Sequence, residues 1–291
     1  MPLLFRDDPY YASKEYNLED IEVSILSVGN WGNTAVHLRG NILGYLVAGS
    51  LYKFLRLGVG RHDLPFYQDE EQPPIDMVVR KGNVGYNDPE AEKAGYTRRT
   101  ENEWPLARTQ YTNYYLHRNG TMSTEPEATQ VEQPVGRLSY EALGTPEEPR
   151  FIEFSTPPFT KETEITGHIV AHLNVSATPH LGKRSSTRVP LETPFLSHRR
   201  HRDWLPHQDY FSTDVQPVIP GEVYAVDVEV WPTNVVVEPG SCLILEIASG
   251  DTPGVGIFVH DGAERTEERF GGMNHIHFAP HYQNYITLPI V

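Results

Sequence analysis

The stretch from residue 21 to residue 67 constrains the fold of this chain more than any other part of its sequence. An apolar, β-branched run at 21–29 ends at a Gly-Asn pair, and apolar residues then recur at roughly helical spacing over 35–49. A second short apolar run follows at 53–59. A strand, a helix and a second strand within about 40 residues predict a right-handed parallel crossover.

Two polar residues come just after the predicted strands. Asn33 follows the first strand, and His62 follows the second. Because functional residues of open parallel sheets gather beyond the carboxyl ends of the strands, both are candidate site residues. The arrangement resembles the last part of an α/β-hydrolase, in which the chain order is nucleophile, acid and then histidine.

The sequence lacks the nucleophile of such an enzyme. The nucleophile elbow requires the pattern G-x-S-x-G, because the sharp turn between strand and helix tolerates only small flanking residues. No serine in the chain has a glycine two positions before it, and Ser50 follows a predicted helix rather than a strand. The single cysteine, Cys242, lies in an apolar run, and we predict a buried structural residue inside a strand.

The composition excludes several classes of protein. A net charge of −15 argues against a nucleic-acid partner and against binding to an anionic membrane. A single cysteine allows no internal disulfide and favours a reducing compartment. The sequence shows neither a basic, apolar leader nor a long apolar stretch, so we expect no signal peptide and no membrane span, and we predict a cytoplasmic location.

The rest of the chain, from about residue 72, has the pattern of a β-sandwich. Short apolar runs alternate with clusters of Pro and Gly, and helical periodicity nearly disappears. In the clearest run, 222–231, apolar side chains share one face while Asp227 and Glu229 share the other. Several such runs between turn signals predict a β-sandwich or jelly roll. The strand candidates are 75–80, 112–117, 151–155, 165–177, 222–231, 242–249 and 284–291.

Five segments, spread over most of the chain, carry a resemblance to a known family. Together they resemble the C-terminal half of the cocaine esterase / X-prolyl dipeptidyl-peptidase (CocE/NonD) group of serine hydrolases, and they occur in the expected order. The segments are S-V-G-N-W-G-N-T-A-V-H-L-R-G-N (27–41), K-F-L-R-L-G-V-G-R-H-D-L-P-F-Y (53–67), E-W-P-L-A-R-T-Q-Y-T-N-Y-Y-L (103–116), P-G-E-V-Y-A-V-D-V-E-V-W-P-T (220–233) and N-H-I-H-F-A-P-H-Y-Q-N-Y-I-T-L-P (274–289).

The resemblance implies a mainly β fold in two domains. Residues 1–67 would be a βαβ remnant of an α/β-hydrolase core, and residues 73–291 a galactose-binding-like jelly-roll β-sandwich. Because the helical linker of the family is absent, the run 75–80 is expected to be the first strand of the sandwich. The resemblance also implies that the intact family hydrolyses esters, or amide bonds after an N-terminal X-Pro unit.

The partners and cofactors follow from the same resemblance. The substrate would be a small ester or an X-Pro peptide, and no cofactor is expected. The other partner would be the missing N-terminal half or, in a homo-oligomer, a second copy of the chain. A truncated gene product, a faulty gene model and an inactive homologue all fit these gaps.

The family's catalytic residues carry over only in part. The catalytic histidine falls on His62, and the catalytic acid falls at or next to Asn33, where the family pattern has Asp. Asn33 can accept a hydrogen bond but has no charge to stabilise an imidazolium. Asp63 is the alternative acid, although adjacent side chains usually diverge. Because a base also needs a nucleophile within hydrogen-bond reach, we expect this chain to be inactive by itself.

Histidines near the carboxyl terminus offer a different reading, a zinc site. His275 and His277 sit two residues apart, which places both on one face of a strand. With His281 or His260 they would provide three imidazoles, a known catalytic ligand set. No Cys, Asp or Glu completes the spacing, so we predict a polar strand edge and no metal.

A further alternative is a non-catalytic β-sandwich module that binds carbohydrate or protein. Several aromatic side chains could line its surface, although core packing accounts for them equally simply. We expect the two tryptophans among them to be structural residues at strand ends. The aromatic candidates are Trp104, Tyr111, Tyr114, Tyr115 and Trp231.

The architecture also predicts which part of the chain is stable. The first two strands would have one crossover helix and no further parallel strand, which leaves an unpaired edge and exposed apolar surface. The sandwich has enough strands to close its own core. Residues from about 72 onward are therefore expected to form the stable unit. Residues 1–67 are expected to be mobile, protease-sensitive or bound to a partner.

Overall fold

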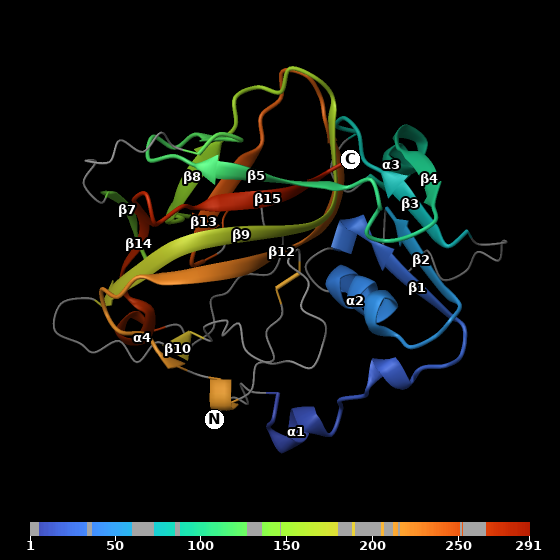
Figure 1. Cartoon of the computed structure of the whole chain (residues 1–291), viewed down its shortest axis with the longest axis horizontal. Coiled ribbons are helices and arrows are strands. Elements are labelled where there is room, and N and C mark those ends of the chain that lie inside the picture. The colour runs from blue at the N-terminus through green and yellow to red at the C-terminus, as the bar shows by residue number, and fades with distance from the viewer. Residues whose placement is uncertain are drawn as a thin grey trace.

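Strands dominate the structure, a computed structural model that describes residues 6–33, 37–59, 73–84, 88–126, 136–145, 147–179, 188–189, 205–206, 212–214, 216–250, 252 and 266–291. Figure 1 shows two neighbouring parts, a small sheet with its helices and a larger set of strands. The prediction of a mainly β chain that begins with a βαβ unit is confirmed.

The first part contains a four-stranded sheet, which we call the small sheet. Its strand order is β1-β2-β3-β4, with β1 parallel to β2, β2 parallel to β3, and β3 antiparallel to β4. The helices and strands of this first part are, in chain order, α1 (Pro9–Ala12), η1 (Leu18–Asp20), β1 (Ile25–Asn30), η2 (Trp31–Asn33), α2 (Arg39–Val47), β2 (Lys53–Gly58), β3 (Ile75–Val79), α3 (Pro89–Gly95) and β4 (Thr97–Glu101).

Helix α2 packs on the small sheet because its apolar residues recur at helical spacing. Leu38, just before the helix, and Ile42, within it, are 0% exposed and share one apolar cluster with Leu57 of β2. Burying a side chain of this size contributes about 1.5–3 kcal/mol. The helix ends before Gly49, where a Cβ atom would collide with the carbonyl oxygen of Glu19. Within the described ranges no helix has both the length and the apolar character needed to cross a bilayer.

Strand β3 corrects two expectations. The run 75–80 does not begin the sandwich, because β3 pairs with β2 and places Ile75 opposite Leu55. For the same reason β1 and β2 do have a further parallel strand. Ile75 and Met77 are 0% exposed and lie in the same apolar cluster as the residues of α2. The small sheet is therefore not confined to the first 67 residues, and the division into units 1–67 and 73–291 stays a prediction.

The second part is built on a seven-stranded sheet, which we call the large sheet. Its strand order is β6-β5-β15-β9-β14-β7, with β12 also paired to β9, and a separate pair, β8 with β13, packs against it. The strands are β5 (Gln110–Leu116), β6 (Met122–Ser123), β7 (Gly136–Glu141), β8 (Phe151–Ser155), β9 (Thr163–Pro179), β12 (Tyr224–Val237), β13 (Ile244–Ala248), β14 (Gly272–Phe278) and β15 (Tyr285–Ile290). The remaining elements are β10 (Arg188–Val189), η5 (Ser212–Asp214), β11 (Gln216–Pro217) and α4 (Glu267–Phe270).

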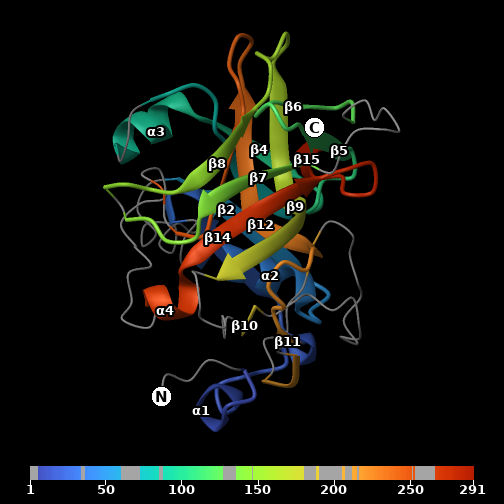
Figure 2. The same ribbon diagram turned by 90° about the vertical axis from the view of Figure 1, so that its left-hand side faces the viewer.

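Strand β9 organises the large sheet, since its two faces have opposite character. Odd-numbered side chains such as Ile165 and Leu173 are apolar and buried, whereas most even-numbered ones, including Glu164 and His168, are polar. This period of two is that of a strand with one face in the core. The core lies between the odd-numbered face and the β8–β13 pair, where Phe154 is 0% exposed. In Figure 2 the β7–β14 end faces the viewer, with the small sheet behind it.

The other predicted runs coincide with β5, β8, β9, β12, β13 and β15. The strand list omits β4, β7 and β14 and the short strands β6, β10 and β11. Strands β4 and β7, with the sequences T-R-R-T-E and G-R-L-S-Y-E, hold few apolar residues. Their charged side chains find partners in the fold: Arg99 of β4 pairs with Glu164 of β9. The galactose-binding-like jelly-roll topology stays a prediction.

Cys242 corrects a further prediction. The residue is exposed and lies before β13 rather than inside a buried strand. Gly240, two residues before Cys242, forms a turn with a φ of 86°, a conformation that glycine adopts easily. In the part of the chain that the structure describes, β13 pairs only with β8, and its first residue, Ile244, is 55% exposed. An apolar run at a sheet edge and one in a sheet interior have the same sequence pattern, so the exposure could not be predicted.

Replacing Ile75 with alanine tests the buried position of β3. Ile75→Ala should lower the free energy of unfolding by about 2–5 kcal/mol, because it leaves a cavity in the small-sheet cluster. The matched control is Ile219→Ala, since Ile219 is 57% exposed, and it should change stability by less than about 0.5 kcal/mol. Urea unfolding followed by circular dichroism measures both. Equal effects of the two variants would contradict the buried position.

Candidate functional site

The carboxyl ends of the three parallel strands define the candidate site. Strands β1, β2 and β3 run in the same direction, so their carboxyl ends lie along one edge of the small sheet, with Asn30 opposite Gly58. Figure 1 shows this edge turned toward β9 and β12 of the large sheet. Ligands of open parallel sheets bind beyond such an edge.

Asn33, which the resemblance predicts at the acid position, comes just after the end of β1 on this edge, and its role stays a prediction. Strand β1 ends at Asn30, and the chain continues into the short 3₁₀ turn η2, which Asn33 closes. The side chain of Asn30 is 4% exposed, and its Oδ1 accepts a hydrogen bond of 2.6 Å from the backbone nitrogen of Gly32. This bond fixes the direction in which the chain leaves the strand.

His62 and Asp63 lie outside the described residues, because the structure describes residues up to 59 and again from 73. Strand β2, which precedes them, ends at Gly58 on the same edge as the η2 turn. The assignment of His62 to the base position and the alternative acid Asp63 stay predictions.

Trp31 and Arg80 bring the ends of β1 and β3 together. Trp31, the first residue after β1, is 3% exposed, and its Nε1 donates a hydrogen bond of 3.1 Å to the carbonyl oxygen of Val78. The guanidinium carbon of Arg80, the first residue after β3, lies 5.4 Å from the centre of the Trp31 ring. A cation at this distance from a tryptophan face is attracted to it. The turn that carries Asn33 is therefore held from the end of the third strand.

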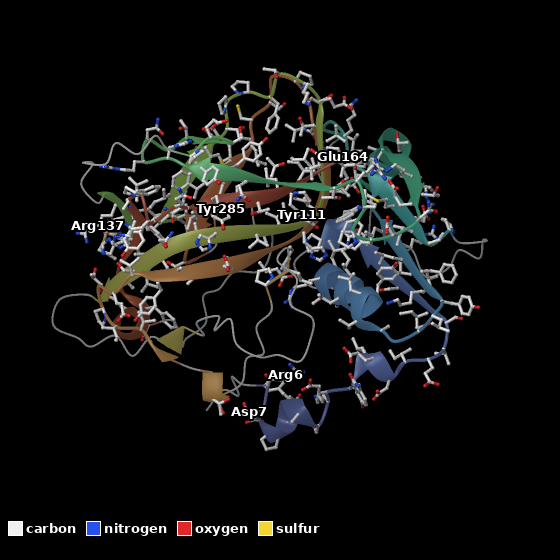
Figure 3. All side chains as sticks on the ribbon, viewed as in Figure 1. Arg6, Asp7, Tyr111, Arg137, Glu164 and Tyr285 are labelled. Carbon is white, nitrogen blue, oxygen red and sulfur yellow. The ribbon has the colours of Figure 1, made fainter. Side chains whose placement is uncertain are left out.

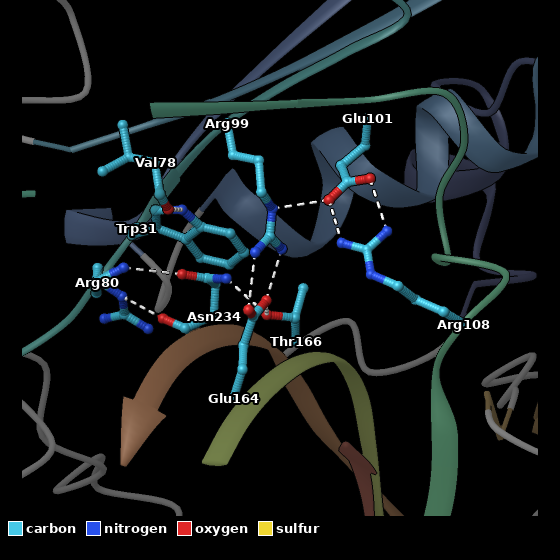
Figure 4. Close-up of polar contacts among 9 residues, drawn as sticks. All are labelled: Trp31, Val78, Arg80, Arg99, Glu101, Arg108, Glu164, Thr166 and Asn234. Atoms are coloured by element: carbon cyan, nitrogen blue, oxygen red, sulfur yellow. Dashed lines mark hydrogen bonds and ion pairs between the residues drawn. The ribbon is translucent and has the colours of Figure 1, made fainter. Parts of the chain in front are cut away.

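Arg80 also ties this edge to the large sheet, as Figure 4 shows. Its Nε donates to the carbonyl oxygen of Asn234 at 2.7 Å, and a terminal nitrogen donates to Thr233 Oγ1 at 2.7 Å. Its backbone nitrogen donates to Asn234 Oδ1 at 2.9 Å. The pairing of β12 with β9 is irregular between Val230 and Thr233. Such bulges redirect side chains and are common beside functional sites. No sequence motif pointed to Arg80 or Asn234.

A second set of contacts links Asn234 of β12 to Arg99 of β4 through Thr166 and Glu164, and we call these four residues the clamp. Asn234 Nδ2 donates to Thr166 Oγ1 at 2.6 Å, and Thr166 Oγ1 donates to Glu164 Oε1 at 2.7 Å. Both terminal nitrogens of Arg99 then donate to the carboxylate of Glu164, at 2.7 and 2.6 Å. Paired bonds of this kind, with both partners charged, are among the stronger polar contacts in proteins. The clamp joins the small sheet to the central strand of the large sheet.

The clamp shifts the pKa of two carboxyl groups. Burial opposes ionisation of Glu164, but the bonds from Arg99 and Thr166 outweigh it and hold the pKa of Glu164 below its usual value. A hydrogen bond from Arg108, with a second arginine nearby, lowers the pKa of Glu101. Both carboxyl groups are therefore ionised at neutral pH, as an ion-pair joint requires.

The two carboxyl-terminal histidines make contacts with hydroxyl groups. The two ring nitrogens of His275 lie 2.7 Å from Ser139 Oγ and 3.1 Å from Thr178 Oγ1. His277 Nε2 lies 2.8 Å from Ser176 Oγ. These contacts cross from β14 to β7 and β9, which flank it on both sides. The expectation of a polar strand edge is therefore wrong, since β14 lies inside the large sheet.

This histidine pair is buried next to a cation. His275 is 4% exposed and His277 is 8% exposed. Burial, reinforced by the charge of Arg137, lowers the pKa of both histidines. Figure 3 shows Arg137 and Glu164 at opposite ends of the large sheet. The pair is thus distant from the carboxyl edge of the small sheet.

The zinc alternative would have to use the same nitrogens. Both ring nitrogens of His275 already contact hydroxyl groups, so a metal ion would displace them. His281 packs against the ring of Tyr282, with 4.2 Å between ring centres. His260 lies outside the described residues. Among the residues that the structure describes, no three metal-ligating side chains form a cluster.

The predicted aromatic residues divide between core and surface. Trp104 is 5% exposed, and its Nε1 donates to His168 Nε2 at 3.3 Å, as befits a structural residue. Tyr114 packs against the core. Tyr111 is 36% exposed, and the partial burial of its hydroxyl group raises its pKa to about 12. Trp231 lies within β12, not at its end, and is 37% exposed. The prediction that it is a structural residue at a strand end is therefore wrong.

A polar row on the large sheet was not anticipated. The side chains of Asp227, His172, Tyr285 and Tyr115 occupy directly opposite positions on β12, β9, β15 and β5. His172 Nδ1 lies 2.6 Å from Asp227 Oδ1, and its ring stacks on Tyr285 with 4.9 Å between ring centres. Figure 3 shows Tyr285 near the middle of the sheet. Residues far apart in sequence become neighbours only through strand register, so no motif marks this row.

Comparisons with known proteins agree with this architecture. A family model described as the X-Pro dipeptidyl-peptidase C-terminal non-catalytic domain matches residues 69–185 and 195–287. A cocaine esterase from Rhodococcus sp. (strain MB1 Bresler) is 27% identical over 66% of the chain. A crystal structure of a CocE/NonD family hydrolase from Staphylococcus aureus superposes on 99% of the chain with a TM-score of 0.73 at 17% identity. An aminopeptidase from a marine sediment Thaumarchaeota archaeon superposes on 98% with a TM-score of 0.57 at 12% identity.

The chain spans only part of the length of these relatives. It covers 40% of the cocaine esterase, 57% of the staphylococcal hydrolase and 58% of the archaeal aminopeptidase. At such low sequence identity the two structures show a shared fold and no more.

Removing the charge of Glu164 tests the clamp. Glu164→Gln should lower the free energy of unfolding by about 1–3 kcal/mol, because it leaves the guanidinium of Arg99 without its main partner. Glu162→Gln is the matched control, since Glu162 pairs with Lys81 where their side chains are 53% and 49% exposed, and it should cause no measurable change. Chemical unfolding at neutral pH measures both. A Glu164→Gln variant as stable as the wild type would show that the ion pair does not hold the sheets together.

The buried histidines predict a pH dependence of stability. Because the pKa of His275 is lowered in the folded chain from an ordinary value of 6.5, the unfolded chain binds a proton first as the pH falls below that value. Stability is therefore retained above about pH 6.5 and lost as the pH falls toward the folded pKa. His275→Asn removes this loss. The stability difference between wild type and variant should be smaller at about pH 5.5 than at about pH 8, and a constant difference would contradict the expected shift.

Proposed function

The chain belongs to the X-Pro dipeptidyl-peptidase C-terminal non-catalytic domain family, and on this premise we propose that it acts as the C-terminal part of a serine hydrolase of the CocE/NonD type. The matched relatives are longer proteins with hydrolase names. In this proposal the chain contributes the carboxyl edge of the catalytic sheet and the large sheet that supports it. The chain alone has no hydrolytic activity.

The inactivity follows from the residues at the edge. In a serine hydrolase the serine attacks the acyl carbon, a histidine transfers the proton, and an acid orients the histidine. Here His62 would serve as the base, and Asn33 stands where the acid belongs. In a serine protease, an Asp→Asn change at the acid lowers kcat by about 10⁴-fold. The sequence contains no G-x-S-x-G elbow, so the nucleophile has to come from another polypeptide segment.

The contact between Arg80 and Asn234 is the observation that carries this proposal. It holds the end of the third parallel strand, and through Trp31 the turn that carries Asn33, against strand β12. Catalytic groups must be held within a fraction of an ångström of their productive geometry, which requires a rigid support. We infer that the non-catalytic large sheet provides this support.

The edge of strand β1 suits the partner that supplies the nucleophile. In the described part of the chain β1 pairs with β2 alone, and the carbonyl oxygen of Val28 accepts a bond from the side chain of Asn41 rather than from a strand. Leu26 on this strand is 49% exposed, and Val23 just before it is 73% exposed. An unpaired edge with apolar side chains is a site for strand addition. We propose that the N-terminal half of the hydrolase sheet adds here, and a second copy of the chain is the competing occupant.

The substrate class comes from the names of the relatives. Cocaine esterase cleaves an ester by its name, and the family model names X-Pro dipeptidyl-peptidases. We propose that the assembled enzyme hydrolyses a small ester or the amide bond after an N-terminal X-Pro unit.

A second candidate function is a binding module without catalysis. The row Asp227, His172, Tyr285 and Tyr115 favours it, because a carboxylate, an imidazole and two phenols line up across four strands. Aromatic rings with a few polar groups are the usual lining of sites for polar ligands such as sugars. Ligand binding that survives without any hydrolysis would favour this function over the first.

Activity measurements on the isolated chain test the main proposal. The chain should hydrolyse neither p-nitrophenyl esters nor X-Pro anilides above the background rate, because it lacks the nucleophile. A fluorophosphonate probe should label no serine, as seen by intact-mass spectrometry. Circular dichroism on the same sample confirms that the protein is folded.

Asn33→Asp is the matched variant for this experiment. It restores the acid but not the nucleophile, so it should remain as inactive as the wild type. Stoichiometric labelling of a serine in either protein would overturn the proposal that the nucleophile lies elsewhere.

A further inference from the structure

The turn between β5 and β6 carries a chemically reactive pair of residues, Asn119 and Gly120. The amide side chain of an asparagine can react with the backbone nitrogen of the next residue, and glycine obstructs this reaction least because it has no Cβ atom. The sequence contains no other Asn-Gly pair. Asn119 is exposed, as residues at the tip of a turn usually are. Solvent and the neighbouring backbone therefore both have access to its side chain.

Hydrogen bonds hold the side chain of Asn119 against its own backbone. Its Oδ1 accepts one bond of 3.1 Å from the backbone nitrogen of Thr121 and one of 2.7 Å from Thr121 Oγ1. A side chain that is bonded to the backbone two residues further on bends over the residue between them. The Cγ atom of Asn119 is thereby directed toward the nitrogen of Gly120. Both donors also draw electron density from the amide carbonyl, which makes Cγ a better electrophile.

Other asparagines in the described part of the chain lack this combination. Asn174, Asn234 and Asn284 are 5%, 0% and 2% exposed, and each is followed by a β-branched or aromatic residue. Such side chains crowd the backbone nitrogen that would have to react. Asn17 is exposed, but leucine follows it. Exposure, a following glycine and a side chain directed at the backbone coincide at Asn119.

We propose that Asn119 is a site of spontaneous deamidation through a cyclic imide formed with Gly120. The nitrogen of Gly120 forms a bond to Cγ of Asn119 and gives up its proton, and the bond from Cγ to Nδ2 breaks, so that ammonia leaves. Water then opens the ring at either of its two carbonyl carbons. Opening at Cγ gives aspartate, and opening at the main-chain carbonyl gives isoaspartate. No atom changes its oxidation state, and the proposal does not rest on the proposed function.

One hydrogen bond of the turn opposes this reaction. The nitrogen of Gly120 donates to the carbonyl oxygen of His117 at 3.0 Å, and this bond must open before the nitrogen can lose its proton. Exposed turns open locally at a small fraction of the free energy of global unfolding. The bond therefore slows the reaction without preventing it.

Isoaspartate at this position should loosen the contact between the turn and strand β8. The carbonyl oxygen of Gly120 accepts a hydrogen bond of 3.0 Å from the backbone nitrogen of Ser155, and Thr121 forms a bridge to the same residue. Gly120 makes this contact with a φ of 81°. Isoaspartate routes the chain through its side-chain carbon and adds one atom to the backbone, which displaces the carbonyl. Aspartate leaves the backbone unchanged, and its carboxylate can still accept both bonds from Thr121.

Storage of the full chain at mildly alkaline pH, followed by peptide mapping with mass spectrometry, tests the site. The peptide that contains Asn119 should gain about 1 Da before any other peptide does. Chromatography should resolve its product into aspartate and isoaspartate forms, since only the cyclic imide gives both. Asn119→Gln is the matched control, because its longer side chain would have to close a six-membered ring. It should show no gain at this position over the same period.

Hydrogen exchange of the stored protein tests the structural consequence. The amide of Ser155 should exchange faster in the isoaspartate fraction than in the unmodified chain. Asn119→Asp, which has the new charge without the extra backbone atom, should exchange like the unmodified chain.

Three outcomes would overturn these inferences. Faster deamidation at another asparagine, or none at Asn119, would reject the site. Aspartate without any isoaspartate would reject the cyclic imide. Equal exchange at Ser155 in the isoaspartate fraction and the unmodified chain would reject the loosening of the contact with β8.

Discussion

The joint between the small and large sheets depends on a buried polar group that forms hydrogen bonds to both sheets. Asn234 is 0% exposed and bonds both to Arg80 of the small sheet and to Thr166 of the large sheet. Leaving such a group without a partner costs about 1–3 kcal/mol. Because each sheet supplies the partners of the other, the orientation between them is specified by hydrogen bonds as well as by apolar contact. The carboxyl edge of the parallel strands is thereby held toward β12.

Strand β9 allows one element to serve the core and this joint at the same time. Its odd-numbered face, with Ile165 and Leu173, closes the apolar core, and Glu164 on its even-numbered face pairs with Arg99 of the small sheet. Further along the same face, His172 joins the polar row and Ser176 meets the buried histidine pair. The period of two in a strand makes this division possible without any cost to the core. The ion pair to the small sheet, a member of the polar row and a partner of the buried histidine pair thus follow one another along β9.

Sequence patterns predicted local structure well where periodicity was strong. The crossover of β1, α2 and β2 and the long strands β9 and β12 lie where apolar spacing placed them. Strands β4 and β7 were missed because their charged residues suggest a loop until their partners are known. The candidate edge could be located from the strand–helix–strand order, since the ends of neighbouring parallel strands must meet. Arg80 could not be identified, because an arginine after an apolar run has no special pattern.

By itself, the sequence determined the mainly β character, the parallel crossover, the absence of a G-x-S-x-G elbow and the resemblance to the CocE/NonD group, because each depends on residue order or short-range periodicity. Only the tertiary structure decided that β3 joins β2, that Cys242 is exposed, and that Asp227 meets His172. These features depend on which strands pair and in what register. Strand pairing joins residues that lie tens to hundreds of positions apart, and its energy comes from contacts that a local pattern does not contain.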